Sequence, residues 1–135
     1  MTQRGHTFFM EGKMKKIINI DGKDYTMQSS AYTQFAYKNL TGRSLLKDIK
    51  KIIELSGKVQ NDFSVIDDFT EPLLDVAFVM IEEGDSNQVK SKEDFIKSIE
   101  CLYDKEKANW IDDVVMLAMN PISRQLQNEI KPNDK

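Results

Sequence analysis

The chain contains one histidine, His6, and this residue limits the chemistry that the sequence can support. A nucleophilic triad, a histidine-based metal site or a histidine general base would each have to use it. His6 lies in a terminal segment with neither a strand nor a helix period, so an isolated histidine is the better interpretation. We therefore expect no catalytic residues, no bound metal and no cofactor.

Pairs of adjacent acidic residues are the other candidates for chemistry: Asp67-Asp68, Glu82-Glu83 and Asp112-Asp113. Neighbouring residues of a helix do not share a face, so no pair forms a two-carboxylate site by itself. The two aspartate pairs lie near expected helix starts, where negative charge interacts favourably with the helix dipole. Neither the alternating ligands of a calcium loop nor a glycine-rich phosphate loop accompanies them. Capping and solubility are therefore favoured over metal binding.

Composition narrows the classes of function further. The 135 residues fit one domain, and 22 acidic residues interleave with 19 basic ones for a net charge of −3. This balance argues against nucleic acid as the main ligand. The longest apolar stretch, residues 73–81, contains Asp75 and is too short to cross a bilayer. The single Cys101 excludes an intrachain disulfide and fits a reducing cytosol, and its apolar helical surroundings predict a buried, inert thiol.

The elements that position these residues divide the chain into three parts. Residues 1–13 show no period and precede a second start signal at Met14, so either Met1 or Met14 can be the natural start. We expect residues 1–13 to be a disordered leader, and we hypothesise that it is not native. Residues 14–130 read as a single mostly helical domain, and residues 131–135 as a polar tail.

A β-hairpin is expected at the beginning of this domain. Two β-prone runs flank Asp21-Gly22, a dipeptide that tolerates the positive φ of a tight hairpin turn. Pairing across that turn places four apolar side chains on one face: Ile18, Ile20, Tyr25 and Met27. A lone hairpin is marginal in water, so helices must cover this face.

About five helices follow, which makes the fold class mainly α, with an N-terminal β-hairpin packed on a compact helical bundle. Cap and stop signals set their expected bounds. The expected helices run from Ser29 or Ser30 to Gly42, from Ser44 to Gly57, from Thr70 to Gly84, from Ser91 to Tyr103, and from Asn109 to a break at Met119-Asn120-Pro121. A polar loop that reaches Asp68 precedes the third helix. The expected inward residues of the first helix are Tyr32, Phe35, Ala36 and Leu40, and those of the fourth include Ile96.

The third helix is apolar around most of its circumference and should be central. So small a domain does not readily cover all of that surface, and a remaining apolar patch would bind proteins. We predict that this partner-binding patch contains Leu74, Phe78, Ile81, Trp110 and Val114.

The order of motifs resembles the tail assembly chaperones of siphophages and related prophages. The residues that carry the resemblance are Ile18, Ile20–Lys23, Tyr25 and the run Asn39–Leu46, followed by the blocks Glu71–Gly84 and Ser91–Tyr103. The likeness covers most of residues 14–120. Its motifs specify a hairpin, a helix stop and a cap, and they contain no active site.

The resemblance implies a non-enzymatic role in building long non-contractile tails. Such proteins bind the tape measure protein, a long and mostly helical chain, and keep it soluble until tail tube subunits polymerise around it. It also implies a location in the cytoplasm of the bacterial host, absence from the mature virion, and contact with the tail tube protein. We expect self-association through the apolar helix faces, and we expect no binding to nucleic acid or to a membrane. The alternative is a small phage-encoded regulatory adaptor that binds a host or phage protein.

Overall fold

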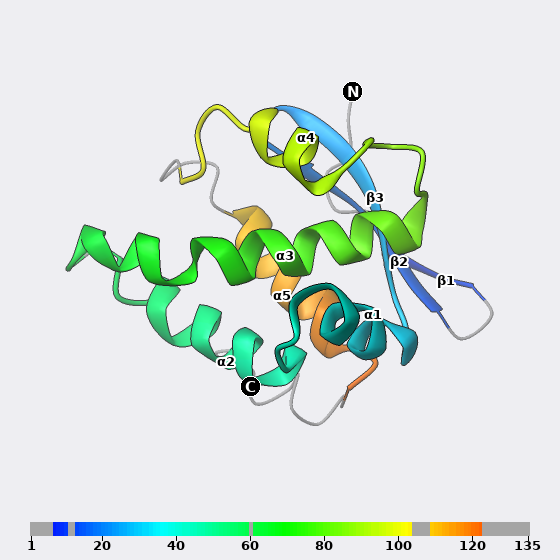
Figure 1. Ribbon diagram of the computed structural model, residues 1–135, viewed down its shortest axis with the longest axis horizontal. Helices are drawn as coiled ribbons and strands as arrows, with labels where there is room; N and C mark the ends of the chain where they lie inside the picture. Colours follow the sequence, from blue (N-terminus) through cyan, green and yellow to red (C-terminus); the bar gives the residue numbers. More distant parts are fainter. Residues whose placement is uncertain (1–6, 11–12, 60, 104–108, 123–135) are drawn as a thin grey trace.

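The computed structural model describes residues 7–10, 13–59, 61–103 and 109–122, and these form a small sheet packed against helices (Figure 1). His6 and the tail 131–135 lie outside the described residues. The elements in chain order are β1 (Thr7–Met10), β2 (Lys13–Ile20), β3 (Lys23–Ser29), α1 (Tyr32–Thr41), α2 (Leu45–Ser56), the 3₁₀ turn η1 (Phe63–Val65), α3 (Ile66–Gly84), α4 (Lys92–Lys97) and α5 (Asn109–Met119). The expected fold class, mainly α with an N-terminal hairpin on a helical bundle, is confirmed.

The hairpin of β2 and β3 has the expected turn and register. Asp21 and Gly22 both have positive φ, 53° and 91°, and Ile18 pairs with Tyr25 across the two strands. The four apolar side chains expected on one face are all buried: Ile18, Ile20, Tyr25 and Met27. Alternation along each strand therefore identified the buried face correctly.

A third strand precedes the hairpin. Thr7–Met10 pairs antiparallel with β2, giving the strand order β1-β2-β3, so the expectation that residues 1–13 lack regular structure is wrong for these four residues. β2 begins at Lys13, and the edge of β2 that faces away from β3 has backbone groups that can form hydrogen bonds. Another strand can pair with these groups whatever the side-chain pattern of that strand, because the bonds join backbone atoms. A four-residue strand is also too short for a period to be recognised in the sequence.

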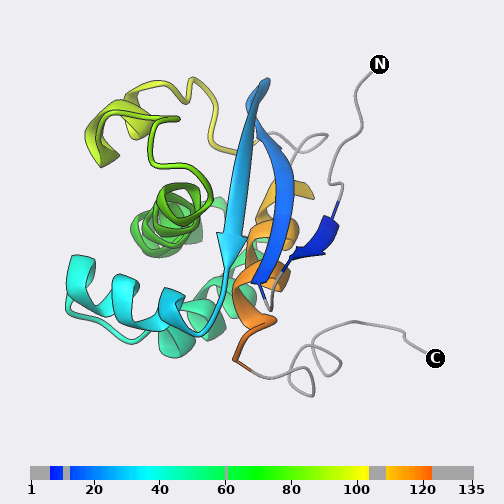
Figure 2. The same ribbon diagram turned by 90° about the vertical axis from the view of Figure 1, so that its right-hand side faces the viewer.

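The sheet lies against α3 and α5. α3 contacts β3 and α5 contacts β2, and β1 is at the edge farther from α3 (Figure 2). The end of α3 approaches β3 so closely that a side chain at Gly84 would collide with the carbonyl oxygen of Thr26. The Gln88 side chain then accepts a hydrogen bond from the Thr26 amide at 2.7 Å and donates one to its carbonyl at 2.8 Å. The side-chain amide of Gln88 therefore occupies the edge of β3 at Thr26, where another strand would otherwise pair.

α3 is the central helix, as expected, but it begins four residues before Thr70. Its first turn is anchored by the buried ring of Phe69, and the Thr70 hydroxyl donates to the Ile66 carbonyl at 2.6 Å. Pro72 lies inside the helix, where it lacks an N–H to donate and its ring crowds the carbonyl four residues earlier. Burial of Phe69 thus outweighs the local preference for starting a helix near the proline.

α4 is shorter than the expected helix from Ser91 to Tyr103. Ser91 caps it by accepting from the Asp94 amide, but the helix ends at Lys97. The amides of Glu100 and Cys101 instead donate to the Asp21 carboxylate in the hairpin turn, at 2.7 and 3.2 Å. Cys101 is consequently exposed, and the expectation of a buried thiol is wrong. Ile96, expected to point inward, is also exposed.

Candidate protein-binding site

α1 exposes three large apolar side chains among the polar residues Gln34, Lys38 and Asn39. Tyr32, Phe35 and Leu40 are 60%, 68% and 42% exposed, although the sequence predicts that they face the core. The residues that α1 buries are Thr33 and Tyr37, which are four positions apart and so share a face, with Phe35 on the opposite side of the helix. The expected inward face of this helix is therefore wrong.

Hydrogen bonds to the buried residues set this orientation. Thr33 donates through its hydroxyl to Glu83 at 2.6 Å, and Ser30 donates to the other oxygen of the same carboxylate, also at 2.6 Å. Tyr37 donates its phenolic proton to Asp48. Burial, followed by the bond to Asp48, raises the pKa of the Tyr37 hydroxyl far above its usual value, so Tyr37 stays neutral. α1 is thus held to α2 and α3 by its polar side chains.

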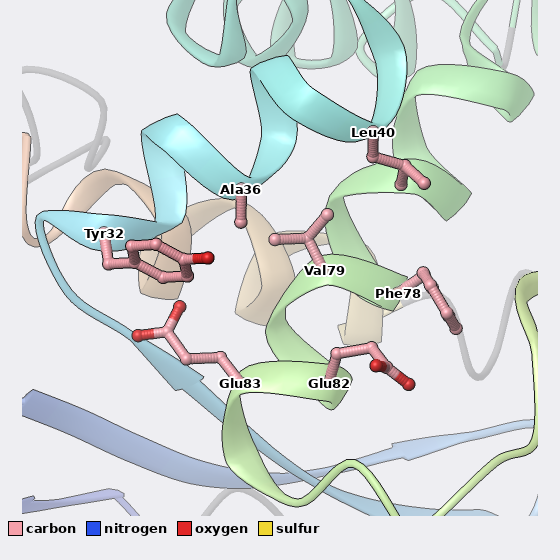
Figure 3. A pocket seen from close by; sticks show the side chains of 7 residues that line it. All are labelled: Tyr32, Ala36, Leu40, Phe78, Val79, Glu82 and Glu83. Atoms are coloured by element: carbon pink, nitrogen blue, oxygen red, sulfur yellow. The ribbon is translucent and has the colours of Figure 1, made fainter.

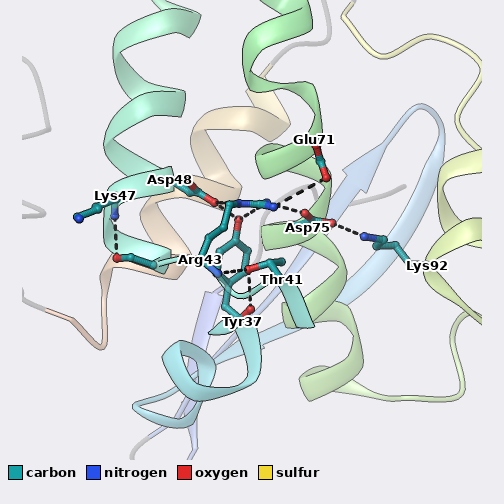
Figure 4. Close-up of polar contacts among 9 residues, drawn as sticks. Tyr37, Thr41, Arg43, Lys47, Asp48, Glu71, Asp75 and Lys92 are labelled. Carbon is teal, nitrogen blue, oxygen red and sulfur yellow. Dashed lines mark hydrogen bonds and ion pairs between the residues drawn. The ribbon is translucent and has the colours of Figure 1, made fainter. Parts of the chain in front are cut away.

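A buried aspartate, Asp75, organises the polar contacts between helices (Figure 4). It accepts from the Arg43 guanidinium at 2.7 Å and from Lys92 Nζ at 2.8 Å. Arg43 also donates through Nε to Asp48 at 2.8 Å, and its two carboxylate partners raise the pKa of its guanidinium. Arg43 and Lys92 pair with Asp48 and Asp75 in this cluster, and Arg43 also lies 3.8 Å from the exposed Glu71. The cluster joins α1, α2, α3 and α4. We interpret it as structural, because each carboxylate already has a charged partner.

A pocket opens between one side of α1 and the second half of α3 (Figure 3). Its volume is about 340 Å³. The lining residues are Tyr32, Ala36 and Leu40 from α1, and Phe78, Val79, Glu82 and Glu83 from α3. Both sets recur at helical spacing, so one stripe of each helix forms a wall. The pocket is apolar along its length and carries two carboxylates at the end of α3.

A second pocket, of about 490 Å³, lies between the first half of α3 and α4. It is lined by Asp67, Thr70, Glu71, Leu74, Asp75, Lys92 and Ile96. Leu74 and Phe78 are one helical turn apart on α3, so the two pockets lie along one stripe of that helix. We call this surface, from Glu71 to Glu82 with its α1 and α4 walls, the α3 groove.

The partner-binding residues predicted from the sequence are all buried, so they form no exposed patch. Leu74 and Phe78 line the two pockets of the α3 groove from below. Ile81, Trp110 and Val114 belong to the core instead. Sequence reasoning assigned the exposed residues Tyr32 and Leu40 to the core, since a helical apolar stripe usually faces inward.

The two aspartate pairs take the places expected of them near helix starts. Asp67 and Asp68 lie in the first turn of α3, and Asp112 in that of α5, where burial and the charge of Asp113 raise its pKa. Within the described part of the chain, no three His, Cys, Asp or Glu side chains gather closely enough to hold a metal ion. No helix in the same residues is long and apolar enough to span a membrane.

Comparison with known proteins adds no relative to this description. No protein-family model, curated protein or solved structure matches the chain.

Proposed function

We propose that this protein is a non-enzymatic tail assembly chaperone of the siphophage type, which binds the tape measure protein and keeps it soluble while the tail tube assembles. The observation that carries the proposal is the set of exposed apolar side chains of α1, Tyr32, Phe35 and Leu40, beside the α3 groove. Such a surface in a charged, mostly helical domain is typical of a protein-binding site.

The shape and chemistry of the surface suit a helical partner. A groove walled by two helices can take the apolar face of an amphipathic helix, as helix-in-groove recognition does elsewhere. Tyr32 and Phe35 add large aromatic area, which contributes strongly to binding where a partner excludes water. A long helical tape measure protein would present many such amphipathic segments before the tube encloses it.

The motifs behind the resemblance build the part of the fold that presents this surface. Gly42, within the Asn39–Leu46 run, ends α1 with φ of 78°, and Ser44 caps α2 by accepting from the Lys47 amide. Between them Arg43 reaches the buried Asp75. The motif thus sets the angle between α1 and α2 and ties α1 to α3, which supports a role in positioning the groove.

Co-expression with a tape measure protein, which the proposal predicts to be encoded close to this chain, tests the proposal. We expect the tape measure protein to appear in the soluble fraction and to co-purify with this chain. A double variant, Tyr32→Ser with Leu40→Ser, should reduce the co-purified amount roughly tenfold or more, because both side chains are exposed and line the groove.

Phe63→Ser provides the matched control. Phe63 is 66% exposed but precedes α3, roughly four helical turns from Phe78. It should leave co-purification unchanged. Circular dichroism must show that all variants are folded. A tape measure protein that stays insoluble with the unmodified chain would refute the proposed function.

A further inference from the structure

We infer that the segment bound in the α3 groove is a basic amphipathic helix of about three turns. The inference rests on the proposed function, since it specifies the chemistry of the bound part of the partner. It is drawn from the length of the groove and from the charges at its two ends.

The length follows from the stripe on α3. Glu71, Leu74, Phe78 and Glu82 are three or four residues apart and so lie on one face of the helix. The two glutamates are eleven positions apart, which corresponds to roughly 16 Å and three helical turns. The apolar side chains lie between the glutamates, flanked by Leu40 on α1 and Ile96 on α4, both exposed.

The charges of the groove are predominantly negative. The pocket beside α1 is lined by two carboxylates, Glu82 and Glu83, and by no lysine or arginine. The Ser30 and Thr33 hydroxyls that bind Glu83 are neutral, so they leave its charge uncompensated. The pocket beside α4 has three carboxylates and one cation, Lys92, which is already paired with Asp75.

Glu71 in that second pocket is available to a partner. Its side chain is 74% exposed, and its ion pair with Arg43 spans 3.8 Å, whereas the two shorter ion pairs of Arg43 go to Asp48 and Asp75. An occupant that places Lys or Arg near both Glu71 and Glu82 would therefore complement the groove, with apolar residues between them. A second copy docked through the same face would bring carboxylates together, so charge disfavours that occupant.

Two designed helical peptides of about 18 residues provide the test on the full-length protein. Both carry one leucine stripe, and they differ only in having two lysines or two glutamates eleven residues apart at its ends. In fluorescence anisotropy, we expect the lysine peptide to bind roughly five- to thirtyfold more tightly, as two exposed ion pairs allow. The difference should shrink as salt is raised.

Charge reversal in the protein locates the effect. The double variant Glu71→Lys with Glu82→Lys should reverse the preference between the two peptides. The matched control, Glu54→Lys with Glu100→Lys, makes the same change in net charge at exposed positions outside the groove and should keep the preference.

The outcomes separate this inference from the proposed function. Equal binding of both peptides, or an equal loss of preference in the control variant, overturns the inference even if the tape measure protein stays soluble with this chain. The inference would also be overturned if the unmodified protein forms dimers and the variant Glu71→Lys with Glu82→Lys does not. A second copy of the chain would then be the occupant of the groove. A reversed preference with an insoluble tape measure protein would support the groove's chemistry and refute the proposed function.

Discussion

α1 and α2 are consecutive helices of similar length, yet only α2 buries a purely apolar stripe. α2 buries Leu45, Ile49 and Ile52 and directs its lysines outward. α1 buries Thr33 and Tyr37 and exposes its larger apolar residues. The same rule of apolar periodicity describes the first arrangement and fails for the second.

The difference shows that polar anchors can set the orientation of a helix. Tyr37 is fully buried, so its ring contributes as much apolar burial as an inward Phe35 would. Its hydroxyl and that of Thr33 additionally bind carboxylates, and each such bond contributes about 1.5–3 kcal/mol. Turning α1 over would forfeit these bonds for little extra burial. The apolar side chains left outside are then available to a partner.

The largest expected contrast comes from truncating one apolar residue on each helix. Ile52→Ala on α2 should lower the free energy of unfolding by about 2–5 kcal/mol, because it leaves a cavity in the core. Phe35→Ala on α1 should change it by less than about 0.5 kcal/mol, because the ring is mostly exposed. Urea denaturation measures both. Similar losses for the two variants would mean that α1 packs Phe35 inward.

Removing one hydroxyl tests the polar anchor directly. Tyr37→Phe keeps the buried ring but removes the donor to Asp48, and it should lower the free energy of unfolding by about 1–2 kcal/mol. Asp48 retains its bond to Arg43, which limits the loss. A Tyr32→Phe variant is the matched control on the exposed face and should be neutral. Equal stabilities of the two variants in denaturant titrations would argue against the anchor.

The smallest effect is expected at alkaline pH. Tyr37 has a raised pKa in the folded state, because burial and Asp48 disfavour its charged form. An unfolded tyrosine loses its proton near pH 10, so the contribution of Tyr37 is complete below that pH and is lost as the pH rises above it. Melting temperatures above pH 10 should therefore fall more steeply for the unmodified protein than for Tyr37→Phe. Parallel curves would contradict the raised pKa.

Sequence reasoning was reliable where a structure depends on neighbouring residues. The Asp21-Gly22 turn, the caps at Ser44 and Ser91, and the stop at Gly42 each involve atoms within about four residues, so their signals are local. The central position of α3 followed from its unusually apolar composition. These features together were enough to predict the fold class.

The binding surface depended on contacts that no local pattern contains. Thr33 and Glu83 are 50 residues apart, and Arg43 and Asp75 are 32 apart. Periodicity identifies an apolar stripe but not which side of the helix meets the rest of the molecule, because that choice weighs distant polar partners against apolar burial. The sequence by itself therefore determined the helices, the turns and the central element. Only the tertiary structure decided that Tyr32 and Leu40 face outward while Ile81, Trp110 and Val114 lie in the core.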